Sequence, residues 1–309
     1  MRSTKRGFVL ILSLSCVLSC VQTKYAYAHE PLWGESPQTF AFGIWHPEFR
    51  FGFQNSSFLY QGSNRIPNPD AMRRTRLDGL FSLQYAPQTS LNIKVDIPFA
   101  QTLISQKIGG QVRRTSATGL GNIRVSAKSR FYQKFGPDWK LHHSYVVGIS
   151  LPTGAGGFNP DGSRLSPSDA PGSNKFGLSL GYAFAYERLE DTLWVSAMFA
   201  SDLGGTGSQG ASFSADANYG YWIKRAMKPQ DLGLLLAAGA HYEAQDRDRV
   251  EGGSDPNSGF NLTGIAMSFI ATKGQAQFRV GALVPVYQHT NGVQLRPEIQ
   301  LRAGIEILL

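Results

Sequence analysis

The strongest constraint on the fold is an alternation of apolar and polar residues that starts at Phe40 and continues to the end of the chain. Side chains of a β-strand point alternately to opposite faces, whereas a helix gives an apolar period of 3.6. In one segment the alternation separates two complete faces: Leu91, Ile93, Val95, Ile97 and Phe99 against Asn92, Lys94 and Asp96. The sequence therefore predicts an all-β chain.

Twelve segments carry this pattern, and most exceed the about 5–6 residues of an ordinary globular strand. A tilted strand needs about 9–11 residues to cross the hydrocarbon layer of a membrane. The predicted strands are Phe40–Gln54, Arg73–Tyr85, Ser90–Ala100, Gly121–Tyr132, Lys140–Leu151, Lys175–Tyr186, Thr192–Ala200, Ala211–Ile223, Asp231–Glu243, Phe260–Ile270, Gln275–Val286 and Gln294–Leu309.

The connections between these segments alternate in length. Longer ones at Asn55–Met72, Gln101–Leu120, Pro152–Asn174, Ser201–Gly210 and Ala244–Gly259 alternate with shorter ones, and only Tyr287–Val293 breaks the pattern by being short. Membrane barrels have long extracellular loops and short periplasmic turns, and closing the sheet pairs every backbone polar group in lipid. We therefore expect residues 40–309 to form an antiparallel transmembrane β-barrel of about 12 strands in the bacterial outer membrane. A secreted β-sandwich is the alternative fold.

The final segment separates its two faces most sharply. Its apolar face holds Leu295, Ile299, Leu301, Ala303, Ile305, Ile307 and Leu309, and its polar face holds Arg296, Glu298, Gln300, Arg302 and Glu306. Such a strand fits lipid outside and water inside. Arg302, Gly304, Ile307 and Leu309 also resemble the C-terminal signal that the barrel-assembly machinery reads, although that signal usually ends in aromatic residues and both positions here are aliphatic.

Residues 1–28 have the layout of a secretory signal peptide. Basic residues precede the apolar run Gly7–Val21, and Ala26-Tyr27-Ala28 supplies an A-x-A cleavage site. Cleavage there leaves residues 29–39 either as a periplasmic N-terminal segment or as a plug in the lumen. Val17–Cys20 resembles a weak lipobox, so lipoprotein processing at Cys20 is a second route.

Removal of the signal changes the thiol content and the charge. Both cysteines lie within it, which leaves no disulfide chemistry in the mature chain. Four of the 30 basic residues leave with the signal, so 26 basic residues remain against 22 acidic ones, a net charge of +4. This modest balance argues against a nucleic-acid partner. No cofactor and no metal is implied; the expected partners are outer-membrane lipid, the assembly machinery and a small-molecule solute.

Two glycine-containing stretches carry a family resemblance. They are Gly119–Arg124, leading to Lys128–Phe131, and Gly148–Gly154. Together they resemble the outer-membrane family named for the meta pathway of phenol degradation. The resemblance implies a barrel with a proposed transport role, in some members for aromatic compounds, and no established substrate.

Basic residues predominate among the side chains expected to face the lumen. Strand parity turns them inward, and the first and last strands become neighbours when the barrel closes: Arg74, Arg76, Lys94, Arg124, Lys128, Arg130, Arg279, Arg296 and Arg302. Such a basic wall favours the passage of anions, because charged linings select ions. Alternatively, these residues pair with Asp78, Asp96, Glu298 and Glu306 and simply fill the interior.

The predicted function is an outer-membrane channel or transporter for small aromatic or anionic solutes, with no catalytic residue. Two other classes remain open. His142 and Ser144 share a strand face at the spacing of outer-membrane phospholipases, although the neighbouring residues differ and parity turns both inward. A closed structural barrel that binds a partner through its loops is the other class. A new N-terminal His29 could chelate a metal, but no ligand cluster supports this.

Overall fold

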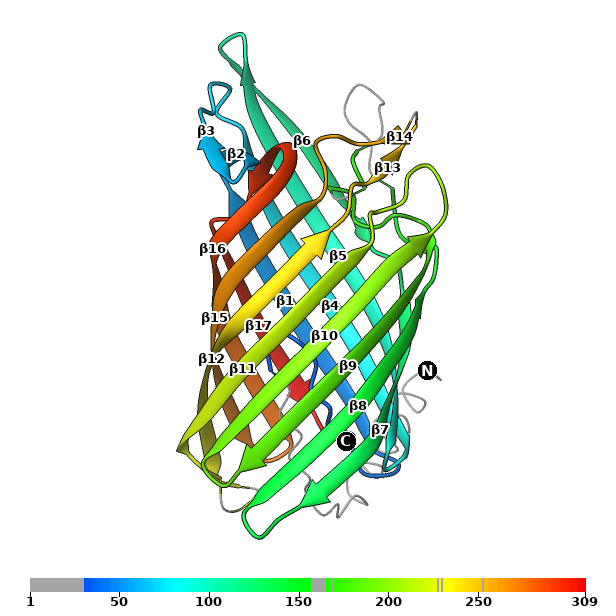
Figure 1. The fold of residues 1–309 in the computed structure, drawn as a ribbon, viewed down its shortest axis with the longest axis vertical. Helices are drawn as coiled ribbons and strands as arrows, with labels where there is room; N and C mark the ends of the chain where they lie inside the picture. The colour runs from blue at the N-terminus through cyan, green and yellow to red at the C-terminus, as the bar shows by residue number, and fades with distance from the viewer. Residues whose placement is uncertain (1–30, 157–164, 168, 227, 229, 252) are drawn as a thin grey trace, which may run out of the picture.

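The computed structural model describes residues 31–309 apart from 157–164, 168, 227, 229 and 252, and this part of the chain contains β-strands and no α-helix. Twelve strands pair antiparallel with their neighbours in sequence order and close into one barrel (Figure 1). They are β1 (Trp45–Ser56), β4 (Arg73–Gln88), β5 (Leu91–Ile108), β7 (Arg124–Phe135), β8 (Trp139–Ser150), β9 (Phe176–Arg188), β10 (Asp191–Leu203), β11 (Ser212–Lys224), β12 (Leu232–Gln245), β15 (Phe260–Lys273), β16 (Ala276–Arg296) and β17 (Ile299–Ile307).

The barrel closes through β17, which pairs with β1 over eight residue pairs from Glu48↔Glu306 to Asn55↔Ile299. The predicted twelve-stranded transmembrane barrel is therefore confirmed, and the β-sandwich alternative is wrong. Within the described residues no helix is long and apolar enough to span a membrane.

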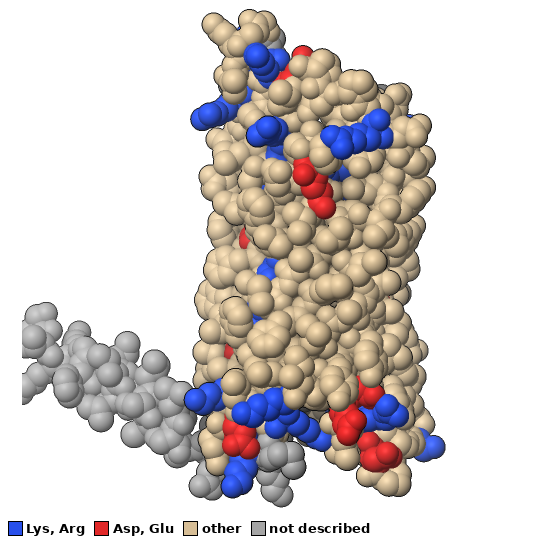
Figure 2. Space-filling model, turned by 90° about the vertical axis from the view of Figure 1, so that its left-hand side faces the viewer, with Lys and Arg blue, Asp and Glu red and all other residues tan. Residues whose placement is uncertain are grey.

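Alternating burial along the strands confirms the predicted inner and outer faces. On β8, for example, His142, Ser144 and Val146 are buried, while Tyr145 and Val147 are exposed. Figure 2 shows the result on one side of the molecule: charged side chains gather at the two ends, and the broad band between them is almost entirely uncharged. An apolar outer band between charged ends is the surface that a bilayer requires.

Several strands continue beyond the barrel wall on the side of the long loops. There lie the short strands β2 (Phe58–Gly62), β3 (Asn64–Ile66), β6 (Gln111–Leu120), β13 (Arg249–Val250) and β14 (Gly253–Ser254). The short turns and the C-terminus lie at the opposite, periplasmic end (Figure 1). This arrangement matches the predicted asymmetry of the connections.

One expected loop is a hairpin. Residues 101–120 were predicted as a connection, but β5 runs on to Ile108 and pairs with β6 along its length. Its turn is Gly109-Gly110, with φ of 57° and 84°, a backbone region in which two-residue hairpin turns need glycine. The two arms pair with each other in water, so they need no apolar face.

Predicted and observed strand ends differ at several places, and two of these differences have a clear physical cause. The first strand begins at Trp45 rather than Phe40, because Gly43 turns the chain with φ 81° and hydrogen-bonds through its N–H to the Ala86 carbonyl at 2.9 Å. The last strand is interrupted at Pro297, which lacks a ladder donor. The register is nevertheless continuous, because Phe58↔Arg296 follows Asn55↔Ile299 at equal spacing on both sides. On the extracellular side of Pro297, the pairing of β1 with β17 therefore continues as the pairing of β2 with β16.

The segment before β1 lies inside the barrel. Four of its residues are almost completely buried, although they do not belong to a strand: Leu32, Trp33, Ser36 and Phe40. The sequence left a periplasmic and a luminal position open for this segment, and residues 31–44 contact inward-facing side chains from several strands. We call residues 31–44 the plug segment.

Candidate functional site in the barrel lumen

The plug segment crosses the lumen between opposite walls. Trp33 packs with Leu262 and Leu283 of β15 and β16, and its carbonyl accepts a hydrogen bond from Asn218 Nδ2 of β11 at 3.0 Å. At the other end of the segment, the Phe40 N–H donates to Asn92 Oδ1 of β5 at 3.2 Å. The segment therefore extends across the lumen from one wall to the other.

Gly34 allows the plug segment to pass close to the wall. Its φ is +85°, and a Cβ there would lie 2.6 Å from Ser196 Oγ and 2.8 Å from Asp216 Cβ. Any side chain would collide with this wall in a backbone conformation that L-residues rarely adopt. The next N–H, that of Glu35, donates to Ser196 Oγ at 3.0 Å.

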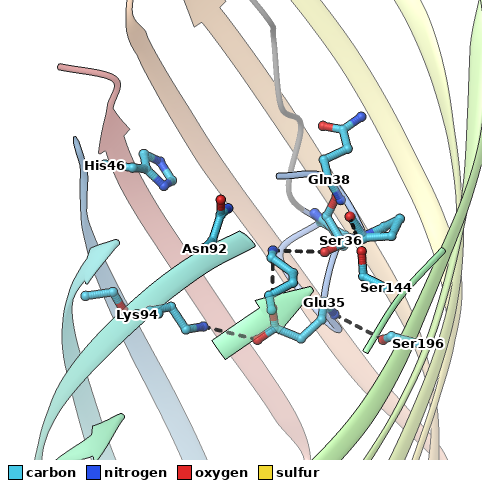
Figure 3. Close-up of polar contacts among 12 residues, drawn as sticks. Glu35, Ser36, Gln38, His46, Asn92, Lys94, Ser144 and Ser196 are labelled. Carbon is cyan, nitrogen blue, oxygen red and sulfur yellow. Dashed lines mark hydrogen bonds and ion pairs between the residues drawn. The ribbon is translucent and has the colours of Figure 1, made fainter. Parts of the chain in front are cut away.

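Glu35 of the plug segment lies against two lysines of the predicted basic wall (Figure 3). Its two carboxylate oxygens face two ammonium groups: Oε1 lies 3.2 Å from Lys94 Nζ, and Oε2 lies 4.0 Å from Lys128 Nζ. Lys128 Nζ also donates to the Ser36 carbonyl at 2.9 Å, and Asp96 lies 3.7 Å from Lys94 Nζ. These two lysines therefore hold a carboxylate inside the barrel.

A second cluster of charges lies where β1, β16 and β17 meet. Arg279 is completely buried; it donates to the carboxylates of Glu48 and Glu306, the latter at 2.7 Å, and its Nη1 approaches the Pro31 carbonyl at 3.4 Å. Arg50 lies 3.0 Å from Glu48. Each charge is paired, as buried charges must be.

Three other predicted residues contact a loop, an aromatic ring or the plug segment. Arg74 pairs with Asp169 of the loop between β8 and β9 at 2.9 Å and donates to the Leu295 carbonyl. Arg296 is buried with its guanidinium 3.5 Å from the centre of the Phe260 ring. Arg302 lies over the Trp33 ring at 5.3 Å, so the strand that closes the barrel also contacts the plug segment.

Three basic residues keep more contact with water. Arg76 pairs with Asp78 at 2.8 Å, and Arg124, opposite Asp96 in the register, is exposed. Arg130 lies at the periplasmic end, where it donates to the Thr89 carbonyl at 2.9 Å. Parity therefore places all nine predicted residues on the inner face, but the structure divides them into separate groups at different heights.

Several basic residues of this wall lie beside acidic ones, while selection of anions by the wall stays a prediction. Asp78, Asp96 and Glu306 lie beside Arg76, Lys94 and Arg279, as the pairing interpretation expected. Glu298 instead accepts hydrogen bonds from the N–H and hydroxyl of Ser57, beside the Pro297 interruption.

Sequence reasoning missed part of the lumen. Arg50 was not among the predicted residues, although its parity with Glu48 on β1 turns it inward. His241 lies 2.7 Å from Asp216 and 3.7 Å from Glu243, a polar group on the wall that holds Gly34. The same period-two rule could have found both. Glu35 carried no strand pattern and therefore gave no such signal.

The two stretches with the family resemblance meet at the extracellular end of the barrel. Asn122 Oδ1 accepts from the N–H groups of Gly154 at 3.0 Å and Asn174 at 3.2 Å, while its Nδ2 donates to Ser173 Oγ and the Lys175 carbonyl. A Cβ at Gly154 would lie 2.8 Å from the Gly172 Cα. These motif residues therefore anchor the base of the long loop between β8 and β9.

The arrangement around Ser144 does not favour the hydrolase alternative. Both His142 and Ser144 are buried on the inner face, away from lipid, and Ser144 Oγ donates to the Pro37 carbonyl of the plug segment. Within the described part of the chain, His142 Nδ1 has no hydrogen-bond partner and no three metal-binding side chains converge.

Other sequence predictions concern the ends of the chain. Ile307 and Leu309 point outward, while Gly304 faces inward, where a Cβ would come within 3.3 Å of Arg50 Cγ. Recognition of these positions by the assembly machinery stays a prediction. The signal peptide of residues 1–28, the Cys20 lipobox and His29 lie outside the described residues.

Comparisons with known proteins agree with the fold. Residues 47–296 match the profile of the family described as "Putative MetA-pathway of phenol degradation". A search of curated proteins finds no match to the sequence. An outer membrane channel from Pseudomonas putida F1 superposes with a TM-score of 0.64 at 14% identity, covering 88% of this chain and 97% of that one. At this identity the likeness shows the fold alone.

Two further solved structures are more distant. The β domain of a Bordetella autotransporter has 11% identity and a TM-score of 0.41, covering 87% of this chain and 100% of that one. The Pseudomonas putida toluene transporter TodX has 8% identity and a TM-score of 0.38, covering 86% of this chain and 89% of that one.

Proposed function

The chain belongs to the MetA-pathway family of phenol degradation, and we propose that it is a passive outer-membrane channel for small aromatic or anionic solutes. The observation that supports this proposal most directly is the interior. The outer face of the barrel is uncharged between its charged ends, and the inward-facing Arg124, at the extracellular end of β7, keeps contact with water. A completely filled lumen would keep its inward-facing charges out of contact with water.

The solute classes follow from two separate lines of support. The family is described by a phenol pathway, which supports aromatic solutes. Lys94, Lys128 and Arg124 lie on the neighbouring strands β5 and β7, which supports anions, since positive linings raise the local concentration of anions. An aromatic ring that bears an anionic group satisfies both.

Conductance and reversal potential of the purified protein in a planar bilayer under a salt gradient test the proposal. We expect a steady current with anion preference, and Arg124→Gln should shift the reversal potential toward cations, because it removes a water-exposed lumen charge. Arg130→Gln makes the same change of charge at the periplasmic end, so the two shifts in reversal potential can be compared. Lys273→Gln, exposed beside the β15–β16 turn, is the matched control and should leave the reversal potential unchanged.

A silent bilayer with folded protein would contradict the channel and leave the closed surface-interaction barrel. Correct folding is checked by the different migration of unboiled and boiled protein in detergent gels. The proposed partners are outer-membrane lipid around the apolar band and the assembly machinery at the C-terminal strand. The hydrolase is tested separately, by calcium-dependent release of fatty acid that Ser144→Ala abolishes.

A further inference from the structure

We propose that Lys94 and Lys128 form a binding site for the carboxylate of a small organic monoanion, and that Glu35 of the plug segment occupies this site in the resting protein. The inference rests on the proposed channel function and names the solute class of its lumen. The chain would thus carry an internal mimic of its own solute.

The geometry is that of a bound carboxylate. Each Glu35 oxygen faces one ammonium group, Oε1 that of Lys94 at 3.2 Å and Oε2 that of Lys128 at 4.0 Å. The two lysines come from the paired strands β5 and β7, where Asn92↔Lys128 and Lys94↔Ser126 place them on one face, two residues apart in register. A rigid sheet therefore sets their spacing, and Glu35 contributes only the carboxylate.

The charge around the site favours an anion. Lys94 and Lys128 provide two ammonium groups, and the carboxylate of Asp96 lies 3.7 Å from Lys94 and accepts a hydrogen bond from Ser82 Oγ. Arg124 lies opposite Asp96 in the register and adds a third positive group. Positive groups outnumber Asp96 on this part of the wall, so they attract a carboxylate such as that of Glu35.

The surroundings suit an organic body attached to the carboxylate. Val146 lies directly opposite Lys128 in the β7–β8 register, points inward and is 4% exposed. Ala183 of β9 comes next to it on the same inner face, opposite both Ser144 and Ser196. An apolar patch thus adjoins the ammonium groups, as in sites that orient a mostly apolar ligand by a few polar contacts.

Water can reach the occupant. The Glu35 side chain keeps 21% of its exposure, compared with 1% for Arg279 in the other charge cluster of the lumen. The backbone of the plug segment has separate anchors at Ser196, Ser144 and Asn92. The Glu35 side chain can therefore leave the lysines while these anchors hold the segment in place.

Calorimetric titration of the folded protein in detergent with benzoate and benzamide tests this site, because the two probes share a ring and differ in charge. Glu35→Gln should lower the Kd for benzoate by about tenfold and leave benzamide unchanged, since it removes the competing carboxylate and keeps its shape. Adding Lys128→Gln should abolish the gain.

Asp78→Asn is the matched control. Asp78 is also an interior carboxylate paired with a basic residue, Arg76, so its loss changes the total lumen charge equally without touching the lysine pair. An equal gain in benzoate affinity for Asp78→Asn, or none for Glu35→Gln, would overturn the proposal and leave Glu35 as a latch for the plug segment.

Two readouts separate this inference from the channel itself. Current in a planar bilayer without any benzoate effect of Glu35→Gln overturns the carboxylate site alone, whereas benzoate binding without current overturns the channel alone. If Glu35→Gln does not fold, Lys128→Gln in the native background serves instead, with an expected severalfold weaker binding of benzoate; unchanged binding would overturn the site.

Discussion

At the scale of single residues, the interior is governed by the cost of burying charge. Arg279 is enclosed completely and donates hydrogen bonds to both Glu48 and Glu306. A buried ion pair adds little net stability compared with apolar residues, but removal of one partner costs about 3–5 kcal/mol. The cluster therefore makes the closing strands sensitive to single changes while adding little to their stability.

Arg279→Met should lower the free energy of unfolding in lipid vesicles by about 3 kcal/mol, the lower end of this range, because Arg50 remains 3.0 Å from Glu48. Urea titration followed by tryptophan fluorescence measures the loss. The control is Arg76→Met, whose partner Asp78 is 45% exposed, with an expected loss below about 1 kcal/mol. Equal losses would show that the Arg279 cluster is not energetically buried.

At the scale of elements, the β5–β6 hairpin shows that strand pairing and membrane crossing are separate properties. Its backbone groups pair within the hairpin, from Phe99↔Leu120 to the Gly109-Gly110 turn, while both faces of β6 are largely exposed. An apolar face is required in the membrane and is absent here. The extension therefore belongs to the extracellular side and contributes little to barrel closure.

Replacement of residues 105–114 by Asn-Gly should leave barrel stability and conductance unchanged. The new turn joins Ile104 and Thr115, which already face each other in the register, and Asn-Gly favours the two-residue turns of hairpins. Gel migration of unboiled protein and single-channel conductance measure the outcome. A lower conductance would mean that the hairpin shapes the extracellular mouth.

At the scale of the whole molecule, the plug segment occupies part of the lumen. It contacts β15 and β16 through Trp33 and β5 and β7 through Glu35, so it connects two sides of the barrel that are not neighbours in the sheet. Cross-lumen contacts of this kind narrow the path for solutes, and they stiffen the wall.

Deletion of residues 31–39 should raise single-channel conductance severalfold and lower the thermal stability of the barrel, since both the obstruction and the cross-lumen contacts are lost. Planar-bilayer recording measures the first effect and the temperature of the gel-mobility change measures the second. Unchanged conductance in folded protein would show that ions pass beside the plug segment.

The sequence by itself determined the strand count, the inner and outer faces and the inward position of the nine predicted basic residues. These are local properties, because the pleat of a strand assigns each side chain to a face. Closure follows from them, since only a closed sheet pairs its backbone in lipid. The prediction of a loop at Gln101–Leu120 was wrong, because this hairpin lacks the apolar face by which strands are recognised.

Only the tertiary structure decided what each inward residue meets. Glu35 lies 59 positions from Lys94, and Trp33 lies 185 positions from Asn218, so no local pattern links them. Arg124, exposed to water, and Arg279, buried between two carboxylates, follow the same strand parity. They differ in what the closed barrel places around them: two carboxylates enclose Arg279, whereas Arg124 remains in contact with water.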